Sequence, residues 1–259
     1  MIYTLLILAH VLADFSFQTK KIAKRKKEEI RYLIKHLLIV LLASLFLTVP
    51  FFGLRLLIIV IVTGVTLFHG IIDQLKIYLL NSSFYEKIKN HYELEIFLVD
   101  QVLHILSIFF VISFFPGIQT YNFNIILHRN ILTGFLNIHY INQNLISISA
   151  LVLAILIFNF KGSTIIVRSV LKRYNTDVGK SGDKGEAIGN LERLLITFFI
   201  ILESYALVGF MFTAKSLIRF KDIERKSEND FVEYYLIGSF ISIFLGVISG
   251  IVIKFLAGI

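Results

Sequence analysis

The sequence opens on MIYTLLILAHVLADFSFQTKK, residues 1–21, an apolar run that is long enough to enter a membrane yet carries His10 and Asp14 in its second half. A polar group in hydrocarbon costs free energy unless it is paired. On a helix, the four-residue spacing places these two side chains on one face, one turn apart. The run therefore predicts a membrane helix whose polar groups either stabilise each other against a neighbouring helix or bind a ligand.

The rest of the chain is equally apolar. Of its 259 residues 56% are hydrophobic, and the mean hydropathy is +0.79, well above that of a soluble domain. Several apolar runs approach the roughly 20 residues that cross about 30 Å of hydrocarbon. We predict an all-α, polytopic membrane protein of about seven transmembrane helices, at residues 2–18, 31–51, 54–79, 94–115, 144–160, 190–214 and 232–256.

Charge and cysteine content narrow the function classes. The net charge of +8 favours membrane lipids as partners and no nucleic acid, because no basic stretch belongs to a nucleic-acid-binding motif. The chain has no cysteine, so any metal must be bound by nitrogen and oxygen ligands. The first apolar run lacks a basic n-region and a small-residue cleavage site, so we expect no cleaved signal peptide.

The basic connection TKKIAKRKKEEIRYLIK, residues 19–35, predicts the orientation. By the positive-inside rule it lies in the cytoplasm, which places the N-terminus outside the bacterial cytoplasmic (inner) membrane. Residues 215–231 conflict with this scheme, because they are basic and yet fall outside if every span crosses. Residues 123–141 are expected to be interfacial or re-entrant, and residues 162–174 to lie on the surface or to extend the fifth span.

We expect three segments along the chain: a four-helix membrane domain at 1–115, an interfacial piece with the fifth span and a basic cytoplasmic segment at 116–187, and a two-helix membrane segment at 188–259. The stretch DVGKSGDKGEAIG, residues 177–189, contains GKS, but a P-loop needs a glycine where this chain has Tyr174. It is interpreted as a loop. His91, His128 and His139 also fall in predicted loops and are interpreted as solvated or interfacial.

Four of the predicted spans share a set of polar residues. The set consists of His10, Asp14, His36, His69, Asp73, Asp100 and His104. At 1.5 Å per residue all of them fall in one layer, roughly 6–15 Å from the cytoplasmic ends of the helices. The order of His and Asp reverses on the fourth span, as antiparallel helices require if histidine is always the deeper group. We call these seven residues the His/Asp layer.

Imidazole and carboxylate together are ligands for first-row metals. The layer predicts a divalent transition metal, zinc first among them, as one or two ions, with carboxylates that act as ligands, orient the imidazoles or serve as a general base. Asp14, Asp73 and Asp100 are the candidates for that catalytic role, and Lys76 is placed to stabilise an oxyanion or phosphate. The alternative is a structural hydrogen-bond network between helices.

At these residues the chain resembles a known family. HVLADFSFQTKKIAKRK (10–26), KH (35–36), HGIIDQLK (69–76) and DQVLH (100–104) are similar to the bacterial membrane proteins grouped as domain of unknown function 3307. Residues 188–220 and 233–242 resemble the C-terminal portion of its longer members. The resemblance implies a multi-pass membrane fold and no particular activity. In residue type alone, the layout is also similar to bacterial inner-membrane proteins described as metal-dependent hydrolases.

Charged residues also recur in the C-terminal half. Glu203 falls near the middle of a predicted span, where it must be paired or protonated. Lys215 and Arg219 are four residues apart and so share a helix face that suits a phosphate or carboxylate headgroup. The candidate substrate-binding residues are Gln101, Glu192, Arg193, Lys215 and Arg219. The alternative for the charges at span ends is that their side chains extend to the membrane interface without binding a substrate.

The layer's position near the cytoplasmic face predicts a membrane-embedded metal-dependent hydrolase that acts on a lipid or phosphoester from that side. Two other classes stay open. One is a proton- or divalent-metal-coupled transporter or channel, against which the unbroken spans and the absence of a convincing inverted repeat weigh. The other is a non-catalytic membrane sensor with a structural metal.

Overall fold

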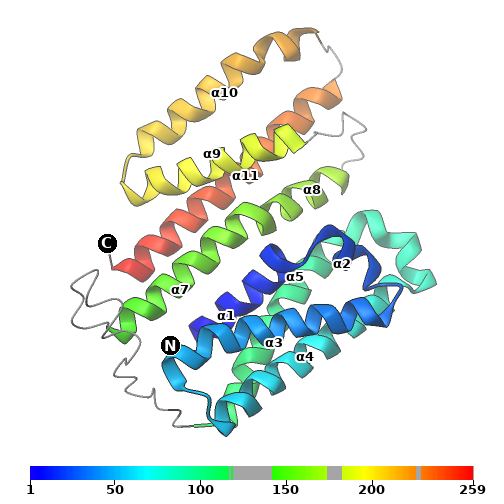
Figure 1. Cartoon of the computed structure of the whole chain (residues 1–259). Helices are drawn as coiled ribbons and strands as arrows, with labels where there is room; N and C mark the ends of the chain where they lie inside the picture. Colours follow the sequence, from blue (N-terminus) through cyan, green and yellow to red (C-terminus); the bar gives the residue numbers. More distant parts are fainter. Residues whose placement is uncertain (117, 119–141, 174–182, 226–228, 259) are drawn as a thin grey trace. The chain divides into compact units, whose positions relative to one another are not determined.

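The computed structural model (Figure 1) describes residues 1–116, 118, 142–173, 183–225 and 229–258, and within these ranges every regular element is a helix. The helices are α1 (Ile2–Val11), η1 (Leu12–Phe17), α2 (Lys20–Arg25), α3 (Ile30–Phe52), α4 (Leu56–Leu80), α5 (Ser83–Ser113), α7 (Gln143–Ile157), η2 (Phe158–Gly162), α8 (Ser163–Arg173), α9 (Asp183–Ile201), α10 (Tyr205–Arg225) and α11 (Asn229–Ala257). The chain forms two compact units, residues 1–89 with 95–154 and residues 90–94 with 155–259. The all-α class is confirmed.

Five helices are long and apolar enough to cross a membrane. They are Ile30–Phe52, Leu56–Leu80, Tyr92–Ser113, Gln143–Arg173 and Tyr235–Ala257. Ile2–Phe17 and Tyr205–Ile218 are apolar but shorter. The multi-pass membrane class is thereby confirmed, whereas seven crossings stay a prediction, because two of the predicted spans correspond to these shorter helices.

In the first unit, α1 packs against α3, and α3 against α4. The fourth helix of the group, α5, meets α1 through Tyr3 and Phe109, whose ring centroids lie 5.0 Å apart. It meets α4 through Phe68 and Phe110, at 5.4 Å. The helix α5 begins at Ser83, so the connection predicted between the spans 54–79 and 94–115 is helical from that residue. The predicted interfacial piece 123–141, with His128 and His139, lies outside the described residues.

The sixth predicted span, 190–214, is two helices rather than one. The helix α9 ends at Ile201 and α10 begins at Tyr205, and Glu203 in the turn between them has a positive φ of 57°. Glu203 therefore does not lie in mid-span; its side chain is 64% exposed and forms an ion pair with Lys254. The predicted pairing of Glu203 is present, but its predicted position near the middle of a span was wrong. The turn contains neither Gly nor Pro, so the sequence gives little sign that the helix ends there.

This hairpin removes the conflict in the charge pattern. In the second unit Arg193 contacts Ser242 and Thr197 contacts Gly246, so α9 and α11 run parallel. The helix α10 comes between α9 and α11 in the sequence, and Figure 1 shows that it runs antiparallel to both. The basic end of α10 therefore lies at the same end of the unit as the basic end of α8. Both basic segments satisfy the positive-inside rule together.

The fifth span continues into the basic helix that follows it. Gln143–Arg173 is one helical run, α7–η2–α8, so the described part of the predicted segment, residues 162–173, extends the span, which is the second of the two alternatives. In the π-helical turn η2, the carbonyl oxygen of Asn159 accepts a hydrogen bond from the Nε of Arg193 at 3.1 Å. Arg193 also donates to Thr164 at 2.7 Å, to Asn190 and to Ser242 at 3.1 Å. We call this group the Arg193 centre.

Replacement of Gly250 by alanine is expected to lower stability by about 1–3 kcal/mol, because the interface of α9 and α11 has no room for a methyl group. A Cβ there would lie 2.6 Å from the Cβ of Ile200 and 2.9 Å from the carbonyl oxygen of Thr197. Gly209 is the matched control, since a Cβ at this exposed position meets nothing within 4 Å. Thermal unfolding of both variants in the same detergent tests this. Equal unfolding midpoints would contradict the close approach.

Candidate metal centre

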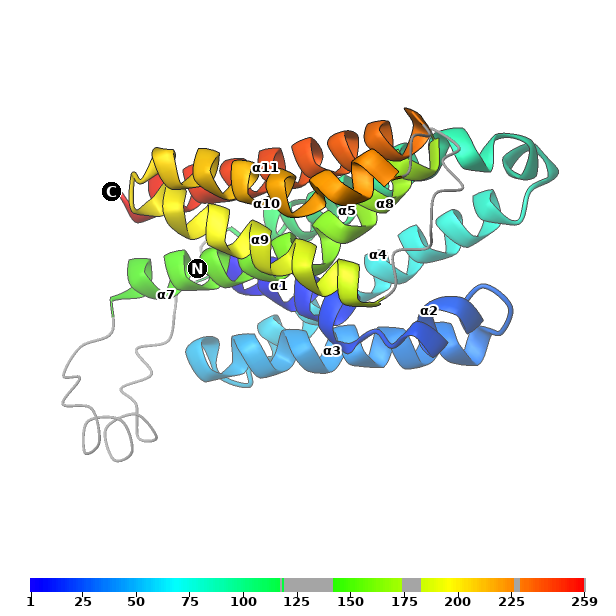
Figure 2. The ribbon, with the colours of Figure 1, turned by 90° about the horizontal axis from the view of Figure 1, so that it is seen from above.

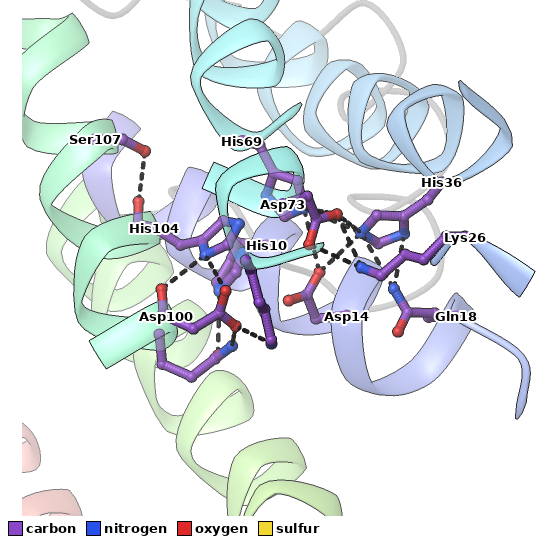
Figure 3. Close-up of polar contacts among 12 residues, drawn as sticks. His10, Asp14, Gln18, Lys26, His36, His69, Asp73, Asp100, His104 and Ser107 are labelled. Atoms are coloured by element: carbon purple, nitrogen blue, oxygen red, sulfur yellow. Dashed lines mark hydrogen bonds and ion pairs between the residues drawn. The ribbon is translucent and has the colours of Figure 1, made fainter. Parts of the chain in front are cut away.

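All seven residues of the His/Asp layer meet inside the first unit (Figure 3). Six of them are 0–5% exposed, and only the side chain of Asp14 has a larger value, 13%. The residues come from four helical segments, α1 with η1, α3, α4 and α5. Three overlapping triads have ligand atoms within 4.8 Å of one another: His10–His69–His104, Asp14–His36–His69 and Asp73–Asp100–His104. The juxtaposition predicted from helix depth is present.

A π-helical turn separates the first two members of the layer. The α-helix α1 gives way to η1 at Leu12, so the chain between His10 and Asp14 rotates less per residue than an α-helix does. His10 consequently meets α5, where its ring stacks on that of His104 at 4.8 Å. Asp14 meets α3 and α4 instead, with its Oδ1 3.2 Å from His36 Nε2. The two side chains thus belong to two neighbouring clusters.

The first cluster consists of Asp14, His36, His69 and Asp73. The Nε2 atoms of His36 and His69 lie 3.0 Å apart. Oδ1 of Asp14 lies 3.2 and 3.5 Å from these two nitrogens, and Oδ2 of Asp73 lies 3.5 and 3.8 Å from them. In a tetrahedral zinc site with bonds of 2.0–2.1 Å, ligand atoms are about 3.3–3.4 Å apart. The spacing of Asp14, His36 and His69 is close to these values, and Oδ2 of Asp73 approaches the same two imidazole nitrogens without forming a single group with Asp14.

The second cluster consists of His10, Asp100 and His104, and its hydrogen bonds fix which ring nitrogens carry protons. Gln101 Nε2 donates to Asp100 Oδ2 at 3.2 Å, so Gln101 Oε1 faces His10 Nε2, which donates to it at 3.3 Å. That leaves the lone pair of His10 on Nδ1. His104 Nδ1 donates to the backbone oxygen of Asp100 at 2.7 Å, which leaves its lone pair on Nε2.

Four buried acceptor atoms in the layer make no hydrogen bond among the described residues, namely His10 Nδ1, Asp14 Oδ1, Asp100 Oδ1 and His104 Nε2, and of these Asp14 Oδ1 has ionic contacts with His36 and His69. Each such atom costs about 1–3 kcal/mol when it is left unsatisfied. Their concentration in one place is unusual, because buried polar groups in proteins are nearly always paired. All four offer an electron pair and none offers a proton, so the partner that suits them is a cation.

Two lysines neutralise part of the layer. Lys76 donates to Asp100 Oδ2 at 2.6 Å, so this candidate for an oxyanion-binding role is engaged by a carboxylate. Lys26 donates to both oxygens of Asp73 at 2.8 Å (Figure 3). Sequence reasoning did not single out Lys26, because it belongs to a run of exposed basic residues with no periodicity. Gln18 was missed for a similar reason; its amide nitrogen lies 3.2 Å from both ring nitrogens of His36.

The C-terminal candidates lie in the second unit. Glu192 and Lys215 pair with each other at 2.6 Å. Arg193 is 3% exposed and turns into the helix bundle, within the Arg193 centre. The side chain of Arg219 lies outside the described residues. A substrate-binding role for these residues, and for Gln101 in the second cluster, stays a prediction.

Comparison with known proteins adds the family. The model of a family described as "Protein of unknown function (DUF3307)" matches residues 2–133, just over half of the chain and all of the His/Asp layer. No curated protein and no solved structure matches the chain. The quoted motifs in the first four helices carried the same resemblance. The chain belongs to the DUF3307 family of proteins.

Proposed function

We propose that this protein binds one or two divalent transition-metal ions, zinc first among them, in the His/Asp layer of its membrane domain. The observation that carries the proposal is the set of four buried acceptor atoms without a hydrogen bond, which lie in three overlapping triads of His and Asp ligand atoms. Neutral imidazole with carboxylate is the donor set of catalytic zinc and of two-metal hydrolase sites. The membrane in question is the bacterial cytoplasmic membrane, with the N-terminus outside.

The proposed activity is metal-dependent hydrolysis of a lipid or phosphoester reached from the cytoplasmic side. Charge supports an anionic substrate. The three carboxylates of the layer, together with the ammonium groups of Lys26 and Lys76 that pair with two of them, have a net charge of −1. A single divalent ion would make the net charge of this buried site positive. Buried charge is costly unless it is compensated, and a phosphate oxygen brings the compensating charge. Asp14, Asp73 and Asp100 are the carboxylates placed to hold a proton from an attacking water.

Elemental analysis of detergent-purified protein tests metal binding. We expect about one or two equivalents of transition metal in the wild type and at least about a tenfold loss in a His36→Ala, His69→Ala double variant. Ser107→Ala is the matched control, because Ser107 is buried beside the layer and donates only to the backbone oxygen of His104. Folded wild-type protein that takes up no metal would overturn the proposal.

The hydrolase activity needs its own test. Metal-loaded protein in mixed micelles is assayed for phosphate release from an aryl phosphate and from a phosphatidic acid. An Asp100→Asn variant that keeps its metal is expected to lose at least about a hundredfold in rate, since general acid–base catalysis contributes 10²–10⁴-fold. Metal-dependent ion flux into liposomes without any phosphate release would show that the protein is a transporter and not a hydrolase.

A further inference from the structure

Lys26 differs from the other basic residues around it. It follows α2, a helix of six residues that begins after Thr19, whose Oγ1 accepts from the backbone N–H of Ile22 at 3.3 Å. Lys20, Lys21, Lys24 and Lys27 are exposed. The side chain of Lys26 is 10% exposed and reaches inward to Asp73, which is 3% exposed. Figure 2 shows α2 beside the first turns of α3.

The contact of Lys26 conflicts with metal binding in the first cluster. Its ammonium occupies both oxygens of Asp73, at 2.8 Å each. The Oδ2 atom of that same carboxylate lies 3.5 Å from His36 Nε2 and 3.8 Å from His69 Nε2, so it is within reach of an ion bound by these imidazoles. Two cations on the same oxygen of a buried carboxylate repel each other strongly where the dielectric constant is low. The ammonium therefore stands in the place of a positive charge that the cluster is built to hold.

Lys76 does not create this conflict in the second cluster. It donates to Oδ2 of Asp100 alone, and Oδ1 of that residue stays unpartnered among the described residues. Asp100 can thus keep its lysine and still offer one oxygen. Asp73 cannot, because a bidentate ammonium leaves neither of its oxygens free of a positive neighbour.

We propose that Lys26 is an exchangeable internal cation and the anion-binding residue of the site. It holds Asp73 while the first cluster lacks an ion. A divalent ion among Asp14, His36, His69 and Asp73 displaces the ammonium from the carboxylate. The freed ammonium stays tethered to α2 at the edge of the layer, where it binds a phosphate group of the substrate. The inference rests on the proposed metal binding and adds to it the way in which loading prepares the substrate site.

The exchange is tested on the wild-type protein by amine labelling and peptide mass spectrometry. Protein stripped with a chelator and protein reloaded with Zn²⁺ react briefly with an acylating reagent. We expect labelling of Lys26 to rise at least about fivefold on loading, since its amine leaves a buried ion pair. Lys24, exposed on the same helix, is the internal control and is expected to react equally in both states. Labelling of Lys26 that is unchanged or lower after verified loading overturns the proposal.

Two variants of opposite effect give an independent test, read out as Zn²⁺ affinity in competition with a chelating dye. Lys26→Met removes the competing cation and is expected to bind Zn²⁺ about tenfold more tightly than the wild type. Lys26→Arg places a guanidinium that can bind a carboxylate bidentately, so it is expected to bind Zn²⁺ about tenfold less tightly. Lys24→Met, which removes a nearby charge that does not touch Asp73, is the matched control and is expected to match the wild type. Equal affinities in all four proteins overturn the exchange.

Inorganic phosphate is the probe for the second half of the proposal. In Co²⁺-loaded protein freed of excess metal, phosphate binding is followed by the visible absorption of the ion. We expect Lys26→Met to weaken phosphate binding at least about tenfold although it strengthens metal binding, because a charge-assisted hydrogen bond is lost. Unchanged phosphate affinity overturns the anion-binding role. Wild-type protein that binds no metal defeats the proposed function itself, which keeps the two failures distinguishable.

Discussion

Replacement of His69 by alanine is expected to remove almost all bound metal, whereas replacement of His36 removes about half when two ions are bound. His69 belongs to two of the three triads, with Nε2 3.0 Å from His36 Nε2 and its ring 4.1 Å from that of His104. His36 belongs to one triad only. Loss of a histidine ligand costs at least as much affinity as loss of a residue that orients one, about 10–100-fold.

Metal content per protein, measured after gel filtration, separates the cases. His104→Ala is expected to lose the ion of the second cluster and to keep that of the first, so it is the counterpart of His36→Ala. Three single variants that lose metal equally would show one shared ion rather than two. Full metal content in His69→Ala would mean that the layer is a hydrogen-bond network and that the metal binds elsewhere.

Replacement of Arg193 by methionine is expected to destabilise the second unit by about 3–5 kcal/mol, the cost of removing one member of a buried polar network. Among the described residues the guanidinium has only uncharged partners, on η2, α8, α9 and α11. Their oxygens are buried and lose this donor in the variant, although Oδ1 of Asn190 keeps the hydrogen bond from Thr164. Methionine fills much of the same volume, so the loss reports the hydrogen bonds rather than a cavity.

Arg168→Met is the matched control, because Arg168 lies in the same unit with a side chain 56% exposed, paired with Glu186 at 2.6 Å. An exposed ion pair contributes about 0–1 kcal/mol. Unfolding by a denaturing detergent, followed by circular dichroism, gives both values. Similar midpoints for the two variants would show that the Arg193 centre contributes no more than a surface charge.

The helices and the His/Asp layer could be predicted because they depend on two strong signals. Apolar length specifies spans, and the cost of a polar group in hydrocarbon singles out residues such as Asp14 and His69. Helix depth then orders them, since antiparallel neighbours must reverse the order of His and Asp. The spacing of ligand atoms within each cluster was beyond reach, because it depends on helix rotation and on the π-helical turn η1.

The missed features have weak or misleading signals. Lys26 is one of several lysines in a run whose members look alike until the fold turns one of them inward. The turn at Glu203 interrupts a run with no Gly or Pro at that point, so hydropathy alone joins two helices into one. Arg193 follows Glu192 at what looks like an ordinary span end, and only the packing of η2 against α9 shows that it is buried.

The distribution of the layer over four segments also has a consequence for biosynthesis. Its histidines stand at positions 10, 36, 69 and 104, so they enter the membrane one helix after another. The first cluster is complete once α4 is in place, and the second only after α5 has followed. The proposed ion of the first cluster can therefore bind before α5 is inserted, whereas that of the second cluster can bind only to an assembled four-helix bundle.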